Sequence, residues 1–165
     1  MDDEQVVARQ LGRMPRAFRR VVVRCPYGRP AITEQEPYDS NGEPFPTTYY
    51  VTCRYLVAAL ARLEAAGGVE RWTAAAASDA QLAASLAAAH EEQREVRRRL
   101  AAGRVGADEG RSLELGIGGT GTPNSLKCLH AHAAFALARP GYELGERIVA
   151  ELDSLWPASG CCMDV

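Results

Sequence analysis

The stretch TTYYVTCRYLVAALARLEAAGG, residues 47–68, decides the fold class of this chain. Residues 47–53 are rich in β-branched and aromatic side chains, which favours a strand that ends at Cys53. Apolar side chains then recur at helical spacing over residues 54–66, and the Gly67-Gly68 pair supplies a stop. A strand that passes directly into a helix predicts an α+β fold.

The sequence on either side adds further strands and helices. RVVVRC (20–25) predicts a buried strand that ends at Cys25, and PAITEQEPY (30–38) is compatible with a second strand. Helices are predicted over residues 3–12, 78–102, 122–139 and 143–155, the third because Thr122-Pro123 is a typical helix start. We therefore expect an α+β protein that is a mainly helical single domain over residues 1–165, with a small sheet of two to four strands.

Composition argues against several classes of partner. The chain has 165 residues and a net charge of −2, so it lacks the basic excess that is typical of nucleic-acid-binding proteins. No apolar run approaches the ~20 residues that span a bilayer, and the acidic start MDDEQVVARQ does not resemble a signal peptide. We expect a cytoplasmic protein that binds neither nucleic acid nor membrane.

The five cysteines lie at positions 25, 53, 128, 161 and 162. Cys25 and Cys53 are predicted at strand exits and Cys128 at a helix entry, positions that tend to gather at one edge of an α+β sheet. The tail of residues 156–165 carries the other two, and we expect it to fold back on this site. Converging thiolates would suit a zinc ion or an iron–sulfur cluster, whereas buried core thiols are equally compatible with the pattern.

The segment NSLKCLHAH, residues 124–132, follows a glycine-rich loop at residues 103–121 and contains Lys127, the only lysine. The loop includes GIGGTG (116–121), but it lacks the strand and the acidic residue that a dinucleotide-binding motif needs. A loop that leads into a helix presents backbone N–H groups to an anion, and Lys127 adds a positive charge there. The same position should stabilise the thiolate of Cys128.

The position of the helix start decides which histidine lies near Cys128. If the whole segment is helical, His130 faces the core, while His132 shares a face with Cys128. If the helix starts later, Cys128 and His130 could both reach one ion. Either histidine could also act as a base for thiol catalysis by Cys128, or could be a structural residue.

The predicted helix over residues 78–102 supports a different kind of function. Apolar positions along it alternate in steps of four and three, which suits pairing with one other helix, either of the same chain or of a homodimer partner. This helix stripe consists of Leu82, Leu86, Ala89, Gln93, Val96 and Leu100. Near the helix end, a solvated basic face is expected from Arg94, Arg97, Arg98 and Arg99. The alternative function is a non-enzymatic helix-mediated interaction module with structural cysteines.

Several motifs together resemble an actinobacterial family of unknown function, often encoded near septum-formation-initiator-like and exopolyphosphatase genes. The motifs are RQLGRMPR (9–16), RCPYGRP (24–30), NGEPFPTTYYVTC (41–53), AHE (89–91), KCLH (127–130) and GCC (160–162). The chain departs from the family pattern at Asn41, where aspartate is usual, at Phe135, where a histidine is usual, and at Cys161, which has no counterpart. The resemblance implies a shared site but no established activity.

These observations combine into one functional hypothesis. We expect an uncharacterised metal-binding protein with a cysteine-ligated centre, which holds a zinc ion or, alternatively, an iron–sulfur cluster. The expected metal ligands are Cys25, Cys53, Cys128 and Cys162. A small anionic ligand is expected beside the centre, in contact with Arg24, Lys127 and His130.

Overall fold

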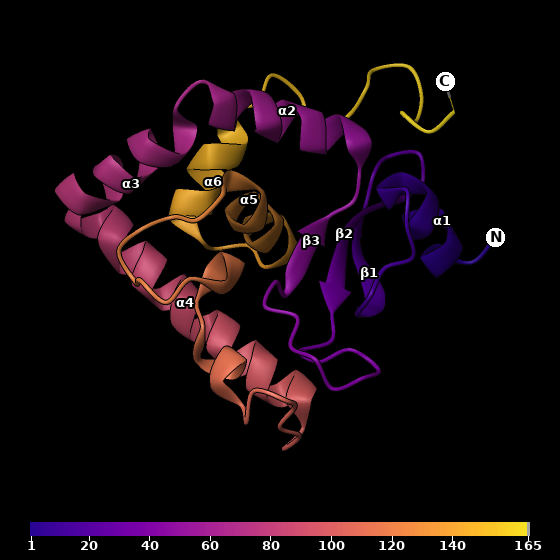
Figure 1. The fold of residues 1–165 in the computed structure, drawn as a ribbon. Helices are drawn as coiled ribbons and strands as arrows, with labels where there is room; N and C mark the ends of the chain where they lie inside the picture. The colour runs from indigo at the N-terminus through magenta and orange to yellow at the C-terminus, as the bar shows by residue number, and fades with distance from the viewer. Residues whose placement is uncertain (165) are drawn as a thin grey trace.

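The sheet has three antiparallel strands in the order β1-β2-β3 (Figure 1). The computed structural model describes residues 1–164, and the strands are β1 (Phe18–Arg24), β2 (Pro30–Gln35) and β3 (Tyr49–Val51). Every residue of β2 is buried, because this strand lies between the other two and has helices on both faces. The expected small sheet is confirmed.

Helices form the larger part of the fold, as expected. They are α1 (Asp3–Leu11), α2 (Arg54–Ala65), α3 (Gly68–Ser78), α4 (Ala80–Ala101), α5 (Leu129–Ala138) and α6 (Glu143–Ala150). Helix α5 packs on β3, α2 and α6, and Figure 1 shows it in the middle of the helical layer. Because it is enclosed on all sides, its sequence LHAHAAFALA has no polar face.

The predicted stop after α2 is confirmed, but a further helix that the sequence analysis missed begins immediately after it. Gly67 has a φ of +86°, which ends α2, and α3 starts at Gly68. A Cβ atom on Gly68 would lie 2.7 Å from both the Leu129 side chain and the Leu63 carbonyl oxygen. The glycine pair is therefore a tight corner between two helices, and Gly68 allows α5 to pack closely against that corner.

Helix α5 begins at Leu129, so the start predicted at Thr122-Pro123 is wrong. The N–H of Thr122 donates to Thr120 Oγ1 at 3.1 Å, in a local turn that does not continue as a helix. The first N–H groups of α5 instead donate to the carboxylate of Glu64, with distances of 3.0 Å from Leu129 and 3.4 Å from His130. A side chain from α2 therefore caps the helix.

The helix stripe of α4 is buried inside the chain. Five of its six residues are at most 3% exposed, namely Leu82, Leu86, Ala89, Gln93 and Val96. They face α3, α6 and the glycine-rich loop. The stripe therefore has its partner within the same chain, and a homodimer through residues 78–102 would have to use other faces of this helix.

Arg97 does not belong to a solvated basic face. Its side chain is fully buried, and its guanidinium donates to the carbonyl oxygens of Phe45 at 2.9 Å and Ser112 at 3.2 Å. Arg98 and Arg99 are exposed, as expected. The helical period explains the difference, because Arg97 follows Gln93 by four residues and so lies on the buried side of α4.

Two irregular segments lie against this framework. The glycine-rich loop 103–121 contains only the 3-10 turns η1 (Arg111–Glu114) and η2 (Ile117–Gly119), and the buried Gln93 side chain donates to its Gly116 carbonyl at 2.6 Å.

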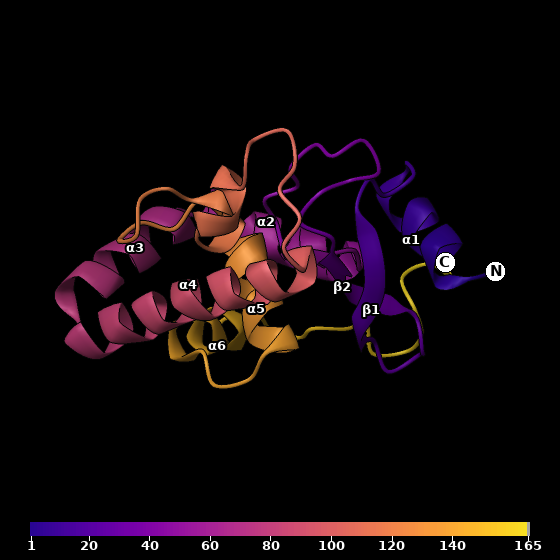
Figure 2. The same ribbon diagram turned by 90° about the horizontal axis from the view of Figure 1, so that it is seen from below.

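Helix α6 ends at Ala150, earlier than predicted, and the tail returns to the sheet. There Cys162 Sγ lies 3.9 Å from Cys53 Sγ. The described tail lies beside the turn between β1 and β2, where Arg29 contacts Asp164 (Figure 2).

Candidate functional site

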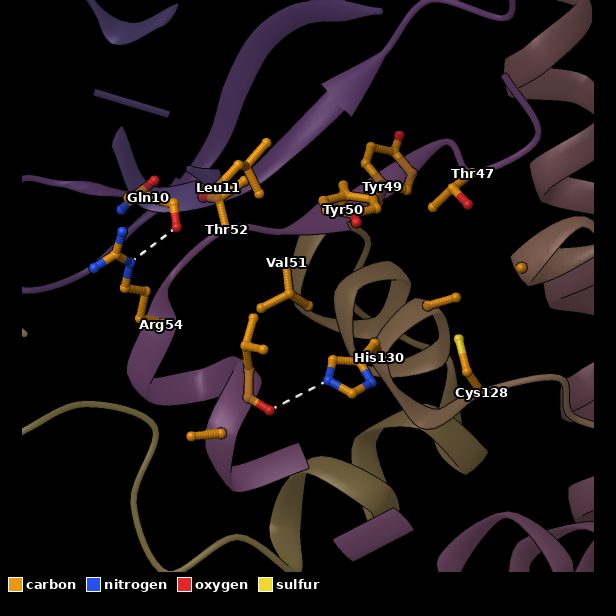
Figure 3. Close-up of a pocket in the computed structure, with 14 residues that line it drawn as sticks. Gln10, Leu11, Thr47, Tyr49, Tyr50, Val51, Thr52, Arg54, Cys128 and His130 are labelled. Carbon is orange, nitrogen blue, oxygen red and sulfur yellow. Dashed lines mark hydrogen bonds between the residues drawn. The ribbon is translucent and has the colours of Figure 1, made fainter. Parts of the chain in front are cut away.

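A cavity of about 600 Å³ lies between α1, β3, α2 and the start of α5. Its wall combines apolar side chains such as Leu11 and Val57 with polar ones. Figure 3 shows Cys128 and His130 on the α5 side, with Arg54 across the cavity. Cavities of roughly 300–1,000 Å³ with a few convergent polar groups are typical of small-molecule sites.

His130 is held in place from both sides of its ring. Its Nδ1 lies 2.5 Å from Glu64 Oε1, and its Nε2 lies 3.2 Å from the carbonyl oxygen of Val57 (Figure 3). Both ring nitrogens therefore have a partner, one on each side of the ring. These two contacts fix the orientation of the ring at this point of the wall.

Arg54, the first residue of α2, is fixed by the end of α1. Its Nε donates to the carbonyl oxygen of Gln10 at 2.9 Å, and its Nη2 donates to that of Arg9 at 2.6 Å. These carbonyls belong to the last turn of α1, where helix carbonyls lack intrahelical partners. Among the described residues no carboxylate lies within ion-pair distance of Arg54. Its charge is therefore positioned but not neutralised.

Arg54 supplies the charge of the cavity wall. The described residues that line the cavity include no aspartate or glutamate, whereas His130 lies 2.5 Å from the Glu64 carboxylate. Gln10 and Thr52, which are buried in the wall, each have a side-chain oxygen without a hydrogen-bond partner among the described residues. The wall therefore offers the Arg54 cation and hydrogen-bonding groups around a mainly apolar space.

The Cys128 thiol lines the same cavity but is not activated. Burial is the main cause that raises its pKa, and the nearby charge of Glu64 raises it further. The N–H of Ala131 and the charge of Lys127 act in the opposite direction without reversing the shift. The expected stabilisation of the thiolate is wrong, because burial of the thiol outweighs the N–H groups of the helix N-terminus and the charge of Lys127.

A family model described as "Protein of unknown function (DUF501)" matches residues 21–150. The chain belongs to the DUF501 family. This confirms the expected membership of an uncharacterised family. No curated protein and no solved structure gave a match.

The metal ligands predicted for this DUF501 protein are not all in one place. Cys53 and Cys162 lie together at the end of β3, whereas Cys128 lines the cavity and the other three cysteines do not. Residues 1–164 contain no group of three or more histidine, cysteine, aspartate or glutamate side chains arranged to hold a metal ion. The cysteine-ligated centre, with zinc or an iron–sulfur cluster, stays a prediction.

Of the three residues expected to bind an anion, His130 lines the cavity. Arg24 is on the surface, where its Nη2 pairs with Asp3 at 2.7 Å. Lys127 is exposed near the cavity but does not line it. In the described chain, no helix is both long and apolar enough to cross a membrane.

His132 has a structural environment. Its ring is fully buried, and its Nδ1 lies 2.7 Å from the hydroxyl of Tyr142. Within the described part of the chain, no hydrogen bond joins Cys128 to His130 or His132. Thiol catalysis by Cys128 with a histidine base therefore has no support in this geometry.

Sequence reasoning missed three important residues of the site, which are Gln10, Arg54 and Glu64. Arg54 directly follows the strand that decides the fold, yet it is one of 18 arginines and carries no distinctive motif. Glu64 lies near the end of a predicted helix, where an acidic residue has no local role to suggest its contact with α5. Only the tertiary packing of α1 and α5 against α2 brings these groups together.

Proposed function

We propose that this DUF501 protein binds a small organic anion with an apolar body in the cavity beside β3. The observation that supports this most directly is Arg54, which lines a mainly apolar cavity and has no carboxylate within ion-pair distance among the described residues. An anion that enters would gain charge-assisted hydrogen bonds there, which are stronger than neutral ones. The proposal keeps the small anionic ligand of the sequence hypothesis and gives its anionic group to Arg54 in place of Arg24 and Lys127. His130, whose two ring nitrogens already contact Glu64 and Val57, forms part of the wall.

Arg54 is suited to hold the anionic group. The carbonyls of α1 use its Nε and one N–H of Nη2, so Nη1 and the second N–H of Nη2 are left for a ligand. The apolar body would lie against Leu11, Val57 and Ala131. A carboxylate matches this arrangement, because its oxygens can accept from these remaining donors.

Ligand-induced thermal shifts test this proposal. We expect aromatic and branched aliphatic carboxylates to raise the melting temperature of the wild-type protein, and the matching amides, which have no charge, to do so much less. Arg54→Gln should lower the affinity for the best carboxylate at least tenfold, measured by calorimetry. The shift is scored within each variant, because Arg54→Gln also removes hydrogen bonds to α1 and lowers the starting stability.

Arg62→Gln is the matched control, since Arg62 is an exposed residue of the same helix outside the cavity. This variant should bind the carboxylate with wild-type affinity. Equal binding of acids and amides, or equal loss in the Arg54 and Arg62 variants, would refute the proposed site.

A further inference from the structure

The ends of β1 and β3 bring cysteines to the same edge of the sheet. Both strands are antiparallel to β2, so they run in the same direction and end on the same side. Cys25 follows β1 and Cys53 follows β3, and both are buried. The N–H of Cys53 points to the Ala31 carbonyl oxygen at 3.4 Å, near the start of β2. The sequence expectation that strand exits gather cysteines holds for this pair.

The C-terminal tail is fastened to this edge by side-chain contacts. Beyond α6 the described tail has neither helix nor strand, yet it is held along its length. The Tyr55 hydroxyl lies 2.6 Å from Ser154 Oγ, and the Tyr27 hydroxyl donates to the Pro157 carbonyl at 2.5 Å. These contacts place Cys162 beside Cys53, with 3.9 Å between the sulfur atoms. Two segments 109 residues apart in the chain therefore meet through a pair of thiols.

We propose that Cys53 and Cys162 form a reversible disulfide that fixes the C-terminal tail to the start of α2. The sulfur atoms are already in contact, and an approach of roughly 2 Å would bring them to the length of a disulfide bond. Rotation about the Cα–Cβ bond can change the distance between the sulfurs, and Cys162 lies on a segment without helix or strand. The proposal is independent of the cavity and of any ligand bound there.

A low-molecular-weight disulfide is the oxidant that completes the chemistry. The Cys162 thiolate, on the more accessible side chain, attacks one sulfur of the oxidant, forms a mixed disulfide and expels the first small thiol. The Cys53 thiolate then attacks Cys162 Sγ and expels the second. The two protein thiols are oxidised, the small disulfide is reduced to two thiols, and the two protons end on the products.

The order of attack follows from the environment of each sulfur. Cys53 is buried, whereas Cys162 is partly exposed, so a small disulfide reaches Cys162 first. Once the mixed disulfide forms on Cys162, the second step is intramolecular between neighbouring atoms, and proximity favours it. In a reducing compartment the pair would remain as thiols until the oxidant accumulates.

Exposure of the reduced, folded protein to oxidised glutathione tests the pair. Free thiols should fall from five to three, the intact mass should fall by two hydrogen atoms, and peptide mapping should link Cys53 to Cys162. The Cys128→Ser variant should form the same link, because Cys128 lies outside the pair. In the Cys162→Ser variant the link should be absent and Cys53 should stay free.

The neighbouring Cys161 offers a second thiol in the tail, so a Cys161 variant is needed to identify Cys162 as the partner of Cys53. Cys161→Ser should still form the link, since the Cys161 sulfur is buried and accepts the N–H of Met163 at 3.5 Å. A link mapped to Cys161 or Cys25, or five free thiols after oxidation of the folded wild type, would overturn the proposal. It would also fail if anaerobically purified protein holds stoichiometric zinc or iron that is lost in Cys162→Ser, because the pair would then be a metal site.

Discussion

His132 shows at the scale of one residue how the core controls protonation. The side chain is fully buried beside Tyr142, and burial is the main cause that lowers its pKa to about 3. The buried His90, with its ring centroid 6.2 Å away, disfavours a second positive charge there. His132 is therefore a neutral core residue over the whole physiological range.

This neutrality predicts acid sensitivity. The folded-state pKa of His132 is about 3, below the value of about 6.5 in an unfolded chain, so on acidification the unfolded state takes up the proton first. Above about pH 6.5 the histidine is neutral in both states and the free energy of unfolding is not reduced. As the pH falls from there toward 3, the free energy of unfolding decreases by up to roughly 1.4 kcal/mol per pH unit. Urea unfolding at pH 7 and pH 5 should show this loss.

A substitution separates His132 from the other titrating groups. His132→Asn can keep a hydrogen bond to the Tyr142 hydroxyl but cannot be protonated. The variant should be less stable at pH 7 yet lose less stability than the wild type between pH 7 and pH 5. An unchanged pH dependence would show that other groups cause the acid sensitivity.

At the scale of one element, the start of α5 is set by Glu64. Its carboxylate accepts two N–H groups of the helix and also contacts the ring of His130. A carboxylate at this position both caps a helix and interacts favourably with its dipole. The same contact explains why α5 cannot offer this end to an external anion.

Removal of this cap should destabilise the protein. Glu64→Ala is expected to lower the free energy of unfolding by about 1–2 kcal/mol, since it leaves the first N–H groups of α5 without their acceptor. Amide hydrogen exchange should speed up most at Leu129 and His130. Glu95→Ala, an exposed change on α4, is the control and should alter stability by less than about 0.5 kcal/mol. Equal effects of the two changes would rule out the cap.

An element could be predicted from the sequence where the residues that determine it lie within or next to that element. The strands β1 and β3 and the helices α2 and α4 carry their own periodicity, and α1 ends at Gly12, so local sequence is sufficient for them. The start of α5 depends on a carboxylate 65 residues earlier, which no local pattern reveals. For the same reason His130 could be predicted in the site, whereas Arg54 could not, because its place depends on the end of α1.

At the scale of the whole molecule, Arg97 joins the helical layer to the sheet. From the middle of the core it bonds to the loop before β3 and to η1. Burial lowers its pKa to about 10, which still leaves it charged at neutral pH. One buried cation thus connects α4, the loop before β3 and η1.

Arg97→Met should destabilise the whole protein by about 3 kcal/mol, because it keeps much of the volume but leaves two buried carbonyl groups without donors. The loss should appear as a lower urea midpoint of a single transition. Arg99→Met, on the exposed face of the same helix, should shift the midpoint little. If both variants unfold at the same midpoint, Arg97 does not connect the layers as described.

The wall of the cavity includes residues outside the segment that the family model matches. The match covers residues 21–150, whereas Gln10 and Leu11 of the wall come from α1. A chain trimmed to the matched region would keep β3, α2 and α5 but lose the part of the wall that α1 supplies and the carbonyls that fix Arg54. Binding studies on the matched segment alone would then measure a wider cavity, in which Arg54 lacks the two backbone acceptors that orient it.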